Sequence, residues 1–149
     1  MSKIANFENL IFNEHLGDNR GDLPSFGTNF VGDTSRLASF NIEHSPVDMG
    51  YILMSLWGVE KNSHKVELNG INLFASGNFA YQIGRHTTSN WVIPFNSNIL
   101  RQGNNSLQLL RDTNGGDNFH LYTAIVNWKE EISFSGRSRL NLIERVSGS

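Results

Sequence analysis

Residues 100–128 read LRQGNNSLQLLRDTNGGDNFHLYTAIVNW, in which two runs of alternating apolar residues flank a polar segment. Alternation with a period of two is typical of a β-strand with one buried face. The segment TNGGDN between the runs is rich in Asn, Asp and Gly, which favour tight turns. We therefore expect Ser106–Asp112 and Phe119–Trp128 to pair as an antiparallel hairpin, and the protein to be all-β.

Short apolar runs separated by turn residues recur along the rest of the chain, as in sandwiches and barrels. The nine expected strands are Phe7–Phe12, Thr28–Val31, Leu37–Glu43, Tyr51–Val59, His64–Leu68, Ile71–Phe74, Trp91–Phe95, Ser106–Asp112 and Phe119–Trp128. In the stretch YILMSLWGV at 51–59, the residues that would point to either face of a strand are largely apolar, which predicts a central strand covered on both faces. Asn69-Gly70 predicts a type I′ turn in a second hairpin. NSNILRQ at 96–102 predicts one helical turn.

The chain has 149 residues, of which 38% are hydrophobic, with 14 Gly and 3 Pro. This length predicts one domain with a buried core. We place that domain at residues 1–134, because no repeat or linker interrupts it. Residues 135–149 form a C-terminal tail that carries Leu140, Ile143 and Val146 at helical spacing. The tail is expected either to dock on a partner or to fray.

Charge and composition exclude several classes of protein. The 12 basic and 14 acidic residues nearly balance, which argues against nucleic acid or an anionic membrane as the main partner. The absence of Cys excludes disulfides, zinc–thiolate sites and thiol nucleophiles. No apolar run is long enough for a membrane-spanning helix. The amino terminus lacks the apolar run of a signal peptide, so we expect a cytoplasmic protein, with leaderless export as the alternative.

The order of motifs indicates a family. VELNGINL at 66–73 is followed by an aromatic strand, by LRQGNNSLQL, and by a last strand that ends in VNW. This order resembles galactose-binding-domain-like jelly rolls over about Leu37–Trp128, and especially an uncharacterised prokaryotic group among them. The resemblance implies an antiparallel jelly-roll β-sandwich of about 8–9 strands. It also implies a binding or scaffolding module, often one that binds glycans and holds a calcium ion in a loop.

Residues 74–90 form the longest stretch without periodicity, and long loops are frequently functional. A sugar is recognised by an aromatic ring against its apolar face and by planar polar groups that bond its hydroxyls. The candidate ligand-binding residues are Tyr81, Arg85, His86, Trp91, Arg111 and His120. The competing interpretation is that the strand tryptophans, Trp57, Trp91 and Trp128, are core residues.

The polar segment 112–118 offers oxygen atoms of the kind that Ca²⁺ prefers. The candidate metal ligands, for a structural calcium ion, are Asp112, Asn114, Asp117 and Asn118. The acidic loop GDNRGD at 17–22 could add Asp18, Asn19 or Asp22. The competing interpretation is that Asn114 and the glycines after it form the turn, while Asp112 and Asp117 cap main-chain amides.

Sequence signatures of catalysis are missing: the chain has no GxSxG elbow, P-loop, GxGxxG fingerprint or HExxH helix. We therefore expect a non-enzymatic ligand-binding module that recognises carbohydrate. The alternative is a structural protein that self-associates, or docks on a larger complex, through its sheet edges and its tail. A hydrolase whose carboxylates come from separate strands is a third possibility.

Overall fold

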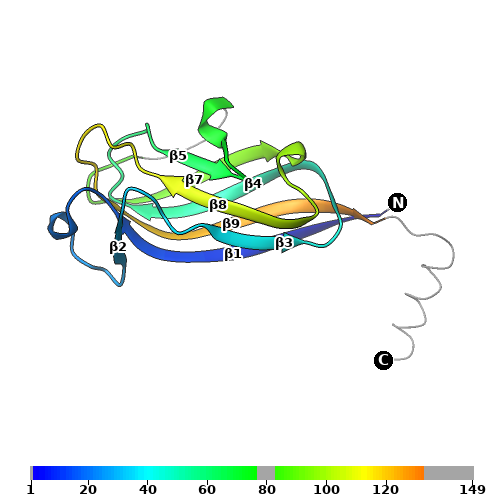
Figure 1. The fold of residues 1–149 in the computed structure, drawn as a ribbon, viewed down its shortest axis with the longest axis horizontal. Coiled ribbons are helices and arrows are strands. Elements are labelled where there is room, and N and C mark those ends of the chain that lie inside the picture. Colours follow the sequence, from blue (N-terminus) through cyan, green and yellow to red (C-terminus); the bar gives the residue numbers. More distant parts are fainter. Residues whose placement is uncertain (1, 77–82, 133–149) are drawn as a thin grey trace.

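The computed structural model describes residues 2–76 and 83–132, and within these ranges the protein is all-β. Two sheets pack face to face, as Figure 1 shows. The five-stranded sheet has the order β2-β1-β9-β4-β7, and the four-stranded sheet the order β3-β8-β5-β6. The strands are β1 (Ser2–Leu16), β2 (Asn29–Gly32), β3 (Ala38–Ile42), β4 (Ser45–Trp57), β5 (Lys65–Leu68), β6 (Ile71–Asn72), β7 (Thr88–Asn96), β8 (Gly103–Leu110) and β9 (Phe119–Ile132).

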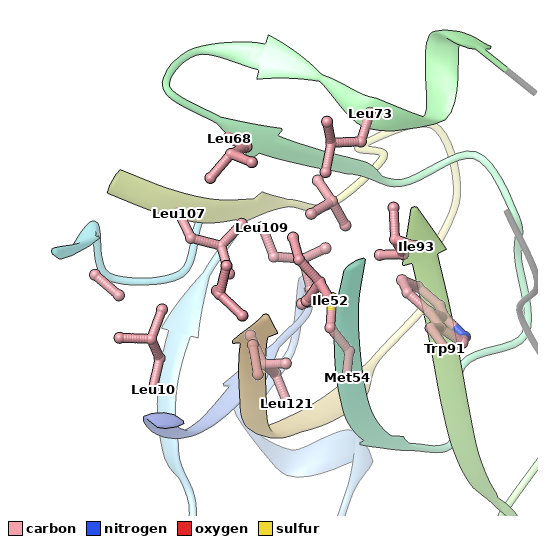
Figure 2. Close-up of a cluster of buried hydrophobic side chains, with 14 of the residues drawn as sticks. Leu10, Ile52, Met54, Leu68, Leu73, Trp91, Ile93, Leu107, Leu109 and Leu121 are labelled. Carbon is pink, nitrogen blue, oxygen red and sulfur yellow. The ribbon is translucent and has the colours of Figure 1, made fainter. Parts of the chain in front are cut away.

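The core lies between the two sheets and is built from the alternating apolar residues of the expected strands. Figure 2 shows Ile52 and Met54 of β4 and Leu121 of β9 beside Leu107 and Leu109 of β8. All five are at most 1% exposed. Burial of apolar surface stabilises the fold by about 25 cal/mol per Å². Each of the nine expected strands overlaps an observed one, so the all-β prediction is confirmed.

The expected hairpin between residues 106–112 and 119–128 is wrong. β8 pairs with β3 and β5 in one sheet, whereas β9 pairs with β1 and β4 in the other. Residues 111–118 therefore cross from one sheet to the other, and we call them the crossing segment. An alternating pattern determines which face of a strand is buried, but it does not determine which strand lies beside it.

The two-sided burial expected for residues 51–59 is also wrong. β4 does lie inside its sheet, between β9 and β7. Its inward residues Ile52, Met54 and Leu56 are buried, but Tyr51 and Leu53, which point outward, are 44% and 39% exposed. The outer face of this sheet therefore carries apolar side chains that no described residue covers.

The two predicted turns are confirmed, because residues within each turn determine its backbone conformation. Asn69 and Gly70 have φ of 53° and 80°, as a type I′ turn requires, and they join β5 to β6. A 3-10 turn at Ser97–Ile99 begins at Asn96, whose side chain accepts a hydrogen bond from the Asn98 N–H. The described strand pairs are antiparallel except β1 with β2, which is parallel and departs from the expected antiparallel pattern. The tail, 135–149, lies outside the described residues.

Candidate functional site

A cavity of about 350 Å³ opens at the end of the sandwich where β4 and β1 end and where β7 and β9 begin. In Figure 1 this is the end away from the amino terminus. Its walls come from the β1–β2 connection, the β4–β5 connection, the segment before β7 and the crossing segment. The lining residues are Asp22, Leu23, Gly58, Glu60, Arg85, His86, Gly116 and Asn118. We call this cavity the end pocket.

Two of the predicted sugar-binding residues, Arg85 and His86, meet in the end pocket. The Nε atom of Arg85 lies 3.9 Å from Oε1 of Glu60, and both side chains face solvent. The ring of His86 stacks on Trp57 with centroids 5.3 Å apart and planes 9° apart. His86 itself has φ of 56°, so the backbone turns sharply to direct this ring onto Trp57. The pocket thus presents a guanidinium, a carboxylate and a braced imidazole together.

Asn118 forms the floor of the pocket and ties the β1–β2 connection to the crossing segment. Its Nδ2 donates toward Oδ1 of Asp18 at 2.8 Å, Oδ2 of Asp22 at 3.0 Å and the carbonyl of Gly116 at 3.0 Å. Its Oδ1 lies 2.9 Å from Nε2 of His15, which is buried. An amide with all its polar atoms engaged is a rigid element, so the floor is preorganised.

Asp117, one of the candidate metal ligands, anchors the β4–β5 connection. Its buried carboxylate accepts hydrogen bonds from the main-chain N–H groups of Glu60 and Lys61, each at 3.2 Å. It also lies 2.7 Å from Nε2 of His64. The N–H of Asp112 donates to Nδ1 of His64 at 2.9 Å, so the ring proton lies on Nε2 and is donated to Asp117.

The other candidate metal ligands are likewise engaged in local bonds. The Asp112 carboxylate accepts from the Asn114 N–H at 2.9 Å. Hydrogen bonds from the Ser63 side chain and from this N–H lower the pKa of Asp112. Within residues 2–76 and 83–132, no group of three or more His, Asp or Glu side chains is arranged to hold a metal ion. In this structure Asp112 and Asp117 accept hydrogen bonds from the main-chain N–H groups of Asn114, Glu60 and Lys61.

Arg111 is part of the scaffold beside the pocket. Its Nη2 and Nε lie 2.7 Å and 3.2 Å from Oδ1 of Asp33. Its Nη1 donates to the Gly115 carbonyl at 3.1 Å, so the guanidinium braces the crossing segment from inside. The side chain is buried and does not line the pocket.

Trp91 and His120 offer no surface to a ligand, because they are 1% and 0% exposed. Nδ1 of His120 lies 2.8 Å from the Thr28 hydroxyl, while its buried Nε2 has no partner among the described residues. Burial, and then the neighbouring His15, lower the pKa of His120. Tyr81 lies outside the described residues. Among the five predicted residues that the structure describes, therefore, Arg85 and His86 are those that line the pocket.

Sequence reasoning missed two parts of this site. Glu60 has no motif around it that marks it as a pocket residue. Trp57 was expected in the core but is partly exposed, and it also contacts Phe26 at 5.1 Å between ring centroids. The available signal was position, because Trp57 is the last residue of β4 and Gly58 follows it with φ of 81°. A strand end beside a sharp turn tends to open onto the loop region.

These features define a class: two packed sheets of an all-β protein, with a polar pocket built by loops at one end. The chain belongs to DUF7383, a family of unknown function whose profile matches residues 4–130. No curated protein and no solved structure matches the chain. Among the described residues, no helix has the length and apolar character needed to cross a membrane.

Proposed function

We propose that this protein is a non-enzymatic module that binds a carbohydrate in the end pocket. The observation that carries the proposal is the set of polar groups around one cavity of about 350 Å³: Asp22, Glu60, Arg85, His86 and Asn118. Ligand pockets commonly have volumes of about 300–1,000 Å³. Sugar hydroxyls both donate and accept hydrogen bonds, and this set offers both. The stacked rings of His86 and Trp57 add an aromatic wall.

Two further observations support the proposal. The motifs at 66–73 and 91–128 resemble galactose-binding-domain-like jelly rolls, and we propose that fold topology for the two packed sheets. The pocket is held by hydrogen bonds of buried side chains, among them Asn118 to Asp18 and Asp117 to His64. A site that is ordered before binding loses less entropy when the ligand arrives. A calcium ion at Asp112–Asn118 would be structural, and comparing binding with and without a chelator tests for it.

A glycan array followed by titration calorimetry with a responsive glycan tests the proposal. Arg85→Ala should weaken binding about tenfold, which corresponds to about 1.4 kcal/mol. The melting temperature should stay unchanged, since Arg85 is exposed and its ion pair with Glu60 is long. Arg101→Ala is the matched control, because Arg101 is an exposed arginine just before β8 at the opposite end of the sandwich. Equal affinities of the two variants, or a folded protein that binds no glycan, would refute the assignment.

Assembly through sheet edges and the tail is the alternative function. The last strand of the five-stranded sheet, β7, includes Pro94, whose missing N–H weakens the addition of another strand there. Deleting residues 135–149 separates the two ideas. Loss of an oligomer with glycan binding intact would favour a structural role for the tail.

A further inference from the structure

The outer face of the five-stranded sheet carries exposed apolar side chains on β1, β4 and β7, and β9 lies between β1 and β4. Its exposed large apolar side chains are Phe7, Ile11, Met49, Tyr51, Leu53 and Val92, with exposed fractions of 39% to 62%. We call this surface the outer face. Monomeric soluble proteins seldom expose continuous apolar patches of this kind, which mark interaction surfaces.

The strand register makes these side chains neighbours. Phe7 of β1 and Tyr51 of β4 both pair with Asn127 of β9, so they flank the same residue. One step along, Leu53 lies between Ile125 of β9 and Val92 of β7. Neighbouring strands lie about 4.8 Å apart, so these rows form one continuous surface.

Among the described residues, the charged side chains on outward positions of this sheet lie near one rim, and Arg36 from the β2–β3 connection donates to the Ile11 carbonyl at the β1 edge. Lys3 pairs with Asp48 at 3.1 Å, and Lys129 is exposed on the central strand near the same end. Between Ala5 and Ile11, the outward positions of β1 hold no charge. An apolar centre with a polar rim is the anatomy of a protein–protein interface.

We propose that the outer face binds the same face of a second copy of this chain, so that two five-stranded sheets pack against each other around a two-fold axis. The surface is a broad sheet, and another sheet is the shape that covers it. The strands β1, β9, β4 and β7 each present four outward residues, which gives about 16 residues per copy. Residues at the rim bring this number close to the about 20–30 residues per partner of a standard interface. The centre carries no charge, so identical faces do not repel. The proposal rests on no feature of the end pocket.

Sedimentation velocity of the full chain tests the proposal, since a monomer has a mass of 16.7 kDa. We expect the protein to be dimeric at micromolar concentration. The double variant Phe7→Lys with Leu53→Lys should sediment as a folded monomer, because it places four cations in the contact. Leu37→Lys is the matched control: Leu37 is 60% exposed and precedes β3 of the other sheet, so this variant should remain dimeric.

A wild-type monomer at all concentrations would overturn the proposal, as would a double variant that stays dimeric. A wild-type monomer that dimerises only when residues 135–149 are deleted would show that the tail covers the face, which also overturns it. If the double variant does not fold, the dimer is tested instead by attaching a spin label to the variant Thr123→Cys and measuring the coupling between labels on two copies. The label attaches at this position alone, since the chain has no other Cys. Sheets packed about 10 Å apart place two such labels within about 30 Å. Absence of coupling between copies would refute the dimer.

Discussion

Replacing Asp117 with Ala removes the anchor that joins the crossing segment to the β4–β5 connection. The carboxylate is 3% exposed and accepts hydrogen bonds from the N–H groups of Glu60 and Lys61 and from Nε2 of His64. The variant leaves these three donors without their acceptor. His64 is 2% exposed, so its N–H is the least able to find water.

The size of the effect follows from the desolvation of these donors. A buried donor left unpaired costs about 1–3 kcal/mol. The two main-chain N–H groups lie near the exposed pocket wall and can recover part of that loss through water. We therefore expect Asp117→Ala to lower the free energy of unfolding by about 3–5 kcal/mol, which is a large part of the about 5–15 kcal/mol of a typical domain.

Urea denaturation followed by tryptophan fluorescence measures this change, with Asp112→Ala as the control. Asp112 lies in the same segment and caps one exposed N–H, that of Asn114, so its loss should cost much less than the loss of Asp117. Similar losses for both variants, together with a wild-type stability that falls on adding a chelator, would refute this reasoning. That result would instead support a calcium ion held by Asp112 and Asp117.

Two further predictions concern the pocket floor and the opposite end of the sandwich. A Cβ at Gly17 would overlap the Asn118 amide, so Gly17→Ala should lower the melting temperature and weaken glycan binding together in paired calorimetric measurements. Burial alone would raise the pKa of Glu130, but hydrogen bonds from Asn6 and the His44 N–H outweigh it and lower that pKa. The resulting stabilisation is present above the ordinary value of 4.5 and is lost as the pH falls through the folded-state pKa. Glu130→Gln should therefore cost about 1–2 kcal/mol at pH 7 and progressively less as the pH falls below 4.5 in urea titrations, and a cost that does not change with pH would contradict this assignment.

The strands could be predicted because their signals are local. Leu107 and Leu109 alternate with polar neighbours, and Asn69-Gly70 supplies the positive φ of its turn. The pairing of β8 and β9 could not be predicted, because both strands present the same pattern whether they lie side by side or face each other across a core. The sequence of the crossing segment resembles a hairpin loop, because Asn, Asp and Gly favour both a tight turn within one sheet and a connection between two sheets.

The pocket was predictable only in part for a similar reason. Arg85 and His86 stand out because they lie in a long aperiodic stretch. Glu60 and Asn118 join them only because the chain crosses between the sheets, a long-range arrangement that no short motif encodes. The outward apolar residues of β4, such as Tyr51 and Leu53, led to a prediction of burial within the chain, but they are exposed. Exposed apolar residues give the same sequence pattern when they form an interaction surface.

The pairing of β1 with β9 bears on how the protein folds during synthesis. The first described strand lies against the last along nearly its whole length, from Ser2 beside Ile132 to Leu16 beside Phe119. A growing polypeptide therefore carries β1 without its main neighbour until residue 132 has left the ribosome. Contacts between such distant segments form slowly, so we expect the five-stranded sheet to assemble after translation of this domain is complete.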